Sequence, residues 1–192
     1  MSLVIENLKE ALIGETKAQR KYDLYAEKAL EENRPEIAHL FKAVSFAENI
    51  HIKNHKRALS LLVDSDANVQ DFLQIDEEEL KNKIGDTFSN LEDAIEGELY
   101  ETKKMYKKFE KNANSLGKEV AELSFSLARD AEKIHADHFS SYLKNLEKGR
   151  EIKKRKIYVC EICGNVEFEE PPETCPVCDH SKNFYKEIDA PF

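Results

Sequence analysis

Glutamate and histidine occur in this chain in two matching sets whose spacing suits metal binding. Each set has a lone glutamate followed, about one helix length later, by a Glu-x-x-His pair. The sets are Glu15 with Glu48 and His51, and Glu98 with Glu132 and His135. Two lone glutamates plus two such i, i+3 pairs, all facing inward from four helices, form the ligand set of a dinuclear carboxylate metal site.

Charge counting indicates which metals suit these ligands. The four glutamates of the two sets balance two divalent ions, and Glu101 offers a fifth carboxylate that offsets part of the extra charge of a diferric pair. Mixed carboxylate and imidazole ligands favour iron or manganese over calcium. Because a buried carboxylate without a partner is costly, glutamates on apolar helix faces require cations. We therefore predict a redox-active dinuclear site.

Other polar residues near these sets have more ordinary interpretations. Tyr22 and Tyr106 are predicted to fill the core, with the alternative that each hydroxyl bonds a ligating carboxylate and fixes its orientation. His55 shares the helix face of His51 but has no counterpart in the second set, so we predict a hydrogen-bonded core histidine or one supporting the ligands. The remaining histidines, predicted to be structural or on the surface, are His39, His138 and His180.

The cysteines form a second candidate metal site. Cys160 and Cys163 make one Cys-x-x-Cys pair, and Cys175 and Cys178 make another. Two such pairs predict a single tetrahedral thiolate site for zinc or iron. Zinc ribbons use similar spacing, but a redox-capable bundle in the same chain favours iron, which carries one electron at a time.

Apolar residues at helical spacing predict the elements that position the bundle ligands. We expect helices over residues 2–31, from Pro35 to residue 62, from Asp76 to Phe109, and from near Gly117 to Leu146. Asp76 and Glu79 have the form of a capping box, and residues 63–75 lose the period and suggest a long crossover. The predicted fold class is mainly α, a ferritin-like four-helix bundle followed by a small β/loop domain with metal-binding knuckles.

Composition changes sharply after the bundle and predicts the domain boundaries. We expect the bundle over residues 1–148, a basic linker over 149–156 and a cysteine-rich domain over 157–192, which holds all four cysteines and four of the five prolines. So short a segment cannot build an independent hydrophobic core, and a metal must hold it together.

Bulk properties exclude several classes of partner. The chain has 192 residues and a formal net charge of −9, which argues against binding nucleic acid or an anionic membrane. No apolar run approaches the roughly 18 residues of a membrane span. The N-terminal sequence has no features of a signal peptide, so a cytoplasmic protein with metal thiolates rather than disulfides is expected.

Several stretches resemble the rubrerythrin family. They are residues 14–22, 46–51, 97–106 and 131–135 of the bundle, together with Cys160-x-x-Cys163-Gly164 and Cys175-Pro-x-Cys178, which resemble the family's rubredoxin-like module. The resemblance covers nearly the whole chain and preserves the order of the modules. Two departures are the long segment at 63–75 and His55, which stands where the family usually has an apolar residue.

The resemblance implies a non-haem diiron peroxidase that reduces hydrogen peroxide to water. It implies as diiron ligands Glu15, Glu48, His51, Glu98, Glu101, Glu132 and His135. It also implies that one iron exchanges Glu101 for His51 on reduction. The cofactors would be two iron ions in the bundle and one iron, with zinc possible, in the tetracysteine site.

The expected partners follow from this activity. Electrons would come one at a time through the rubredoxin-like iron from an external donor, ultimately a reduced pyridine nucleotide through a rubredoxin or ferredoxin-type reductase. We expect a homodimer, possibly larger, arranged head to tail so that one chain's thiolate iron lies beside the other's diiron site, with exchange of helical hairpins as a further possibility. The alternatives are a ferroxidase that handles iron and a non-catalytic zinc-binding scaffold.

Overall fold

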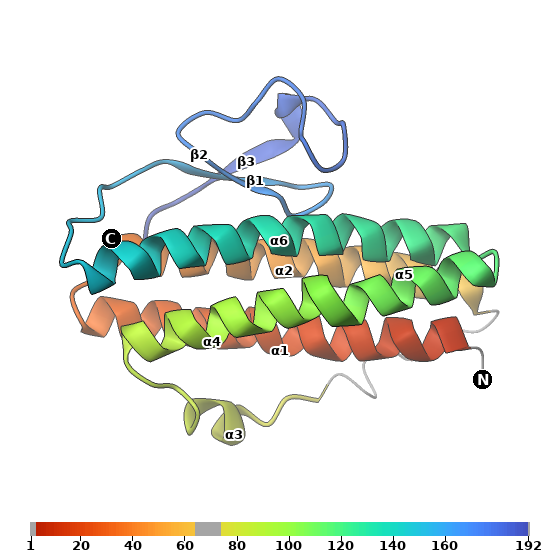
Figure 1. Cartoon of the computed structure of the whole chain (residues 1–192), viewed down its shortest axis with the longest axis horizontal. Coiled ribbons are helices and arrows are strands. Elements are labelled where there is room, and N and C mark those ends of the chain that lie inside the picture. The colour runs from red at the N-terminus through yellow and green to blue at the C-terminus, as the bar shows by residue number, and fades with distance from the viewer. Residues whose placement is uncertain (1–2, 64–73, 192) are drawn as a thin grey trace.

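Four long helices form a bundle in the computed structural model, which describes residues 3–63 and 74–191. α1 (Leu3–Glu31) and α2 (Pro35–Leu62) make the first hairpin, and α2 begins at the predicted proline. The third bundle helix is continuous through α4 (Thr87–Tyr100), the π-helical turn η2 (Glu101–Met105) and α5 (Tyr106–Ser115), and the fourth is α6 (Glu119–Glu147). These helices lie side by side along the long axis of the molecule (Figure 1). The predicted mainly α, ferritin-like fold class is confirmed.

The third predicted helix differs at its start. Asp76 caps a short helix as expected, because its side chain accepts a hydrogen bond from the Glu79 N–H at 2.9 Å, but this helix, α3 (Glu77–Lys81), ends after five residues. Residues 82–86 interrupt the helical path, and Asp86 provides the N-cap for α4 by accepting from the Ser89 N–H at 2.8 Å. The prediction of one helix from Asp76 to Phe109 is therefore wrong, and Leu80 lies outside the bundle helices. Most of the predicted crossover, residues 64–73, lies outside the described residues.

Two apolar clusters fill the bundle at different levels along its axis. One contains Tyr22, Phe41 and Phe139, and the other contains Leu12, Phe109 and Phe125. The glutamates and histidines of the two sets occupy the helix positions between these clusters, where they have little or no contact with solvent. The cores thus hold four helices in register around a polar layer.

The C-terminal segment folds as a three-stranded antiparallel sheet on the bundle. β1 (Ile157–Cys160) is the central strand between β2 (Val166–Phe168) and β3 (Tyr185–Ile188), and the 3-10 turn η3 (Lys182–Phe184) precedes β3. Ile157, Val159 and Val166 join the first apolar cluster, so the sheet packs directly on the helices. Figure 1 shows the sheet over the face of the bundle formed by α2 and α6.

Candidate metal centres

Six of the predicted ligands converge in the middle of the bundle. α1 supplies Glu15, α4 supplies Glu98, and α2 and α6 each supply a Glu-x-x-His pair. Their donor atoms form two groups, each with all atoms within 4.8 Å of one another. Glu15 and His51 belong to one group, Glu98 and His135 to the other, and both groups contain Glu48 and Glu132. Two glutamates shared between adjacent groups are the arrangement that holds two metal ions side by side.

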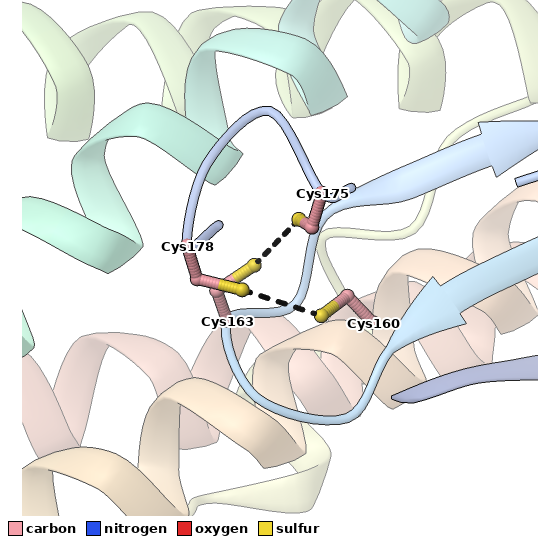
Figure 2. A group of neighbouring side chains, drawn as sticks. All are labelled: Cys160, Cys163, Cys175 and Cys178. Atoms are coloured by element: carbon pink, nitrogen blue, oxygen red, sulfur yellow. Dashed lines mark hydrogen bonds between the residues drawn. The ribbon is translucent and has the colours of Figure 1, made fainter. Parts of the chain in front are cut away.

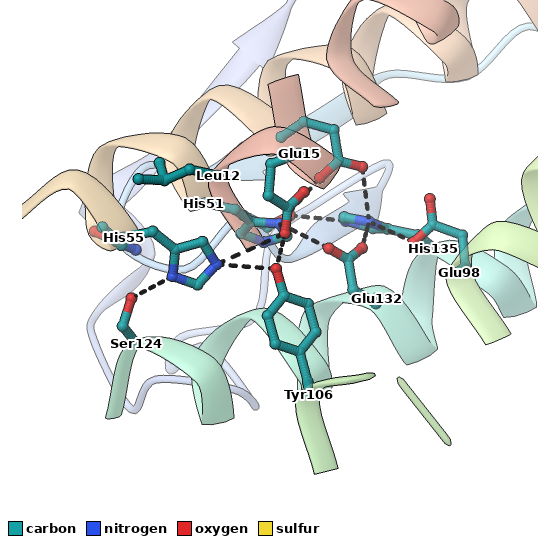
Figure 3. A network of polar contacts seen from close by, with 12 residues as sticks. Leu12, Glu15, His51, His55, Glu98, Tyr106, Ser124, Glu132 and His135 are labelled. Carbon is teal, nitrogen blue, oxygen red and sulfur yellow. Dashed lines mark hydrogen bonds and ion pairs between the residues drawn. The ribbon is translucent and has the colours of Figure 1, made fainter. Parts of the chain in front are cut away.

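The two histidines are oriented by partners on their far side. His51 places Nδ1 3.0 Å from Glu48 and Nε2 3.0 Å from the carbonyl oxygen of Cys163. His135 places Nδ1 2.7 Å from Glu132 and Nε2 3.0 Å from the carbonyl oxygen of Gly164. A carbonyl only accepts, so each Nε2 carries the proton and each Nδ1 is left to bind metal. Figure 3 shows both rings facing the same group of carboxylates.

The buried carboxylates of this cluster need positive charge nearby. Glu15, Glu48, Glu98 and Glu132 each have one buried oxygen without a hydrogen-bond partner. Burial, followed by the charges of nearby carboxylates, raises the pKa of Glu48 and of Glu132 well above the usual value for glutamate. Buried anions in such a cluster are unstable without positive charge. Two iron ions would supply that charge and occupy the free oxygens.

Glu101 occupies a different place from the other predicted ligands. It is half-buried, belongs to neither of the two donor groups, and its Oε1 lies 3.6 Å from the position that a Cβ on Gly14 would take. Burial and the charges of Glu15 and Glu98 raise the pKa of Glu101 well above its usual value. The structure thus places Glu101 beside the cluster, whereas His51 is part of it.

A π-helical turn, which no sequence pattern predicted, begins at Glu101. Eight residues separate Glu98 from Tyr106, which in a regular α-helix leaves them about 80° apart around the axis. A π turn takes up about one extra residue and removes most of this offset. Both side chains therefore face the bundle interior, and both are buried. Single π turns are frequent at functional sites.

Both candidate tyrosines contact ligand carboxylates. The Tyr22 hydroxyl donates to Glu98 Oε1 at 2.5 Å, and the Tyr106 hydroxyl donates to Glu15 Oε1. Each lone glutamate thus has one oxygen held by a tyrosine from another helix, while its other oxygen has no hydrogen-bond partner. Burial, followed by nearby carboxylates, raises the pKa of both phenols well above the usual value. Both tyrosines therefore remain protonated donors.

The four cysteines converge from two knuckles (Figure 2). Cys160 Sγ lies 3.7 Å from Cys178 Sγ, and Cys163 Sγ lies 3.6 Å from Cys175 Sγ, far beyond the roughly 2.05 Å of a disulfide. A tetrahedron with metal–sulfur bonds of about 2.3 Å has edges of about 3.8 Å. The sulfur spacing therefore fits one tetrahedral metal ion.

Comparisons with known proteins agree with this geometry. A family model described as rubrerythrin matches residues 6–155, and one described as the rubredoxin-like domain of rubrerythrin matches residues 158–186. The chain belongs to the rubrerythrin family. Similar curated proteins include rubrerythrin-2 of Clostridium acetobutylicum, 32% identical over 96% of each chain, and a putative rubrerythrin of Methanocaldococcus jannaschii, 35% identical over 97% of this chain and 93% of that one.

A solved structure extends the similarity to the arrangement in space. Nigerythrin in a mixed-valence state matches with a TM-score of 0.85 and 29% identity, covering 98% of this chain and 88% of that one. The carboxylate–histidine groups, the four cysteines and these relatives together support a diiron site and a rubredoxin-like iron site, as predicted. They also support a diiron oxidoreductase. None of the helices in the described part of this rubrerythrin is long and apolar enough to cross a membrane.

The cysteine segment lies directly against the diiron ligands of its own chain. Besides the bonds to His51 and His135, the Asn54 amide donates to the Ile162 carbonyl at 2.9 Å. Gly164, with φ 82°, makes the closest approach, and a Cβ there would lie 2.5 Å from His51 Nε2. The structure shows these contacts within one chain, and the head-to-tail arrangement of two chains stays a prediction.

The other histidines contact main-chain or side-chain groups. Ring nitrogens of His39, His138 and His180 lie 2.8–2.9 Å from carbonyl oxygens of the C-terminal segment. His55 is fully buried between Ser124 and Tyr106 and has no place in either metal group. The contacts of Ser124 and of the Cys163 and Gly164 carbonyls could not be predicted from the sequence, because an ordinary serine and main-chain atoms carry no motif.

Proposed function

We propose that this rubrerythrin reduces hydrogen peroxide to water at the diiron site. The reaction consumes two electrons and two protons for each peroxide, and two iron ions at the bundle site would supply the electrons together. The observation that supports a redox role most directly is the pair of hydrogen bonds between the diiron-site histidines and the cysteine knuckle. A storage or scaffold protein has no need to join a thiolate centre to these ligands.

We propose the following roles for the bundle residues. Glu48 and Glu132 would hold both ions, because both donor groups contain them. Glu15 and His51 would hold one ion, and Glu98 and His135 the other. Glu101 would replace His51 as a ligand when the redox state changes, since it lies beside the cluster with a carboxylate that burial makes costly to ionise without metal. Tyr22 and Tyr106 hold Glu98 and Glu15 in position.

The rubredoxin-like centre would return electrons one at a time. Cys163 is at once a candidate thiolate ligand and the residue whose carbonyl accepts from His51, so a short covalent and hydrogen-bonded path joins the two centres. An external donor, supplied ultimately by NADH through a rubredoxin or ferredoxin-type reductase, would reduce the thiolate iron. We propose a bundle over residues 1–148, a linker over 149–156 and an electron-transfer domain over 157–192, working in a homodimer.

The test is anaerobic mixing of the fully reduced, iron-loaded protein with hydrogen peroxide or with oxygen in a stopped-flow spectrometer. We expect peroxide to oxidise the diiron site faster than oxygen does, and the ferric thiolate colour to follow. Faster reaction with oxygen, accompanied by accumulation of extra ferric iron, would establish a ferroxidase instead. A colourless protein that contains zinc at every site after expression with both metals would overturn the redox proposal.

A further inference from the structure

A line of hydrogen bonds leads away from the diiron site through residues that are not candidate ligands. The Tyr106 hydroxyl donates to Glu15, and the distance from Tyr106 Oη to His55 Nε2 is 2.9 Å. On the opposite side of the ring, His55 Nδ1 lies 2.7 Å from Ser124 Oγ. Figure 3 shows His55 between Ser124 and Tyr106, on the side of the site away from Glu98.

The hydrogen bonds run in one direction. Tyr106 has a single hydroxyl proton and gives it to Glu15, so its oxygen must accept from His55 Nε2–H. A neutral imidazole with the proton on Nε2 accepts at Nδ1, so the Ser124 hydroxyl must donate to it. Each donor in the line therefore points toward Glu15, which is the arrangement needed to pass a proton inward.

The outer end of the line reaches a groove on the surface. Ser124 is only 6% exposed, but it lines an open groove of about 490 Å³ between α2, α6 and the cysteine segment. Arg57, Ile162, Cys178 and His180 line the same groove. Ser124 is therefore the member of the line that borders this groove.

Packing alone does not account for a histidine at this position. His55 and Tyr106 are fully buried, and the His55 ring packs against Phe125, a member of the second apolar cluster. A buried polar ring is costly unless both nitrogens are bonded. Here both nitrogens are bonded, and each partner is a hydroxyl that can donate and accept.

We propose that Ser124, His55 and Tyr106 form the path by which protons from the groove reach the diiron site. This inference rests on the proposed peroxide reduction, which consumes two protons per turnover. Ser124 gives a proton to Nδ1 and takes one from water, His55 gives its Nε2 proton to Tyr106, and Tyr106 gives its hydroxyl proton to the oxygen being reduced beside Glu15. One N–H or O–H bond forms for each that breaks, so one passage delivers one of the two protons and leaves the His55 proton on Nδ1.

The test compares variants that differ only in the hydrogen-bonding line. Ser124→Val removes the hydroxyl, Ser124→Thr restores it at nearly the same volume, and Ser126→Val is the matched control on a half-buried neighbour in α6. His55→Gln keeps groups able to bond both hydroxyls but cannot readily exchange a proton between them. The first readout is the exchange of the His55 Nε2–H proton with water, measured by NMR on the full chain loaded with diamagnetic zinc. The second is single-turnover peroxide reduction by the reduced iron-loaded protein, with its solvent isotope effect.

We expect Ser124→Val to slow the exchange at least about 10-fold and peroxide reduction about 100-fold, in the range of lost acid–base catalysis. His55→Gln should slow reduction by a similar factor with the iron content unchanged, and Ser124→Thr should recover most of both rates. Wild-type rates in both Ser124→Val and His55→Gln would overturn the proton path. If the wild-type protein does not reduce peroxide, the proposed function fails, and the exchange measurement alone still decides whether Ser124 connects His55 to water.

Discussion

Glu132 is the residue on which both halves of the diiron site depend. Its carboxylate belongs to both donor groups. Glu132 Oε1 lies 2.8 Å from His51 Nδ1, and Glu132 Oε2 lies 2.7 Å from His135 Nδ1. α1 and α4 each contribute a donor to one group, and α2 contributes to both through Glu48. A change at Glu132 therefore acts on both ions, while the cysteine site, built from a separate segment, keeps its ligands.

We predict that Glu132→Ala removes the bundle iron and leaves the thiolate iron in place. Loss of a residue that merely supports a ligand lowers metal affinity about 10- to 100-fold, so loss of a shared ligand is expected to exceed about 100-fold. Iron analysis and the visible absorption of the ferric thiolate measure the two sites separately. The exposed Glu147 of the same helix provides the control, Glu147→Ala. Two bundle irons per chain in Glu132→Ala would refute the ligand assignment.

Gly164 decides how closely the cysteine knuckle approaches the bundle. We predict that Gly164→Ala keeps the thiolate iron but displaces the knuckle, because the new Cβ would lie 2.5 Å from His51 Nε2 and 3.2 Å from the Ala47 carbonyl oxygen. Oxidation of the thiolate iron after peroxide addition should slow at least about 10-fold. Gly149→Ala is a matched control, since Gly149 also has a positive φ, of 59°, but nothing lies near its Cβ position. Equal rates in the two variants would show that the contact is irrelevant to electron transfer.

Among the elements, the π-helical turn η2 has the clearest consequence for the site. It aligns Glu98 and Tyr106 on the inner face of the third bundle helix and places Glu101 beside the cluster. The Tyr106 N–H donates to the Glu101 carbonyl five residues earlier, which is the hydrogen bond that defines such a turn. If the same residues formed a regular α-helix, Glu98 and Tyr106 would lie about 80° apart around the axis and could not both face inward.

We predict that deleting the exposed Lys103 converts the turn to regular α-helix and leaves the diiron site intact. After the deletion, Glu98 and Tyr106 stand seven positions apart, which in a regular α-helix leaves them only about 20° apart around the axis, so both stay in the interior. We expect the variant to keep its bundle iron, its helical circular dichroism and its thiolate iron. Inserting an alanine after Lys103 should instead rotate the parts before and after it by about 100° relative to each other and lower the bundle iron to less than about one ion per chain. Loss of the bundle iron in the deletion variant would contradict the interpretation of the turn as one accommodated extra residue.

At the scale of the whole molecule, metal binding and folding stability are linked. In the metal-free protein, burial and neighbouring carboxylates raise the pKa of Glu48, Glu101 and Glu132 well above the usual 4.5. These groups bind more protons in the folded than in the unfolded state, so their contribution to stability is lost as pH rises above about 4.5. The pKa of Glu15 is lowered, because burial, which raises it, is outweighed by the charge of His51 together with hydrogen bonds to His51, His55 and Glu48, and this group affects stability only below that range.

We predict that the melting temperature of the metal-free protein falls by more than about 5 °C between about pH 5 and pH 8, given about 1.4 kcal/mol per pKa unit and about 3 °C per kcal/mol at this size. The iron-loaded protein should not show this fall, because the metal replaces the protons. Differential scanning calorimetry of both forms measures the effect, and Glu48→Gln should reduce the slope in the metal-free form. A metal-free protein as stable at pH 8 as at pH 5 would contradict the linkage.

The sequence alone determined the fold class, the family and the kinds of metal centre. A Glu-x-x-His pair places both side chains on the same face of any helix that contains it, and the spacing of a Cys-x-x-Cys knuckle is also set locally. These signals therefore do not depend on tertiary structure. The caps at Asp76 and the start of α2 at Pro35 are local for the same reason. The family and the iron cofactors predicted from these residues agree with the comparisons.

Only the tertiary structure decided how these parts meet. The predicted third helix is divided over residues 82–86 into two helices that each have their own N-cap, and the π turn depends on which side chains the core must accept. The contact of Cys163 and Gly164 with His51 and His135 joins residues more than 25 positions apart through main-chain oxygens, which have the same chemistry at every residue. The line from Ser124 through His55 to Tyr106 likewise joins three helices. Such contacts follow from packing in three dimensions, and no local pattern of residue types encodes them.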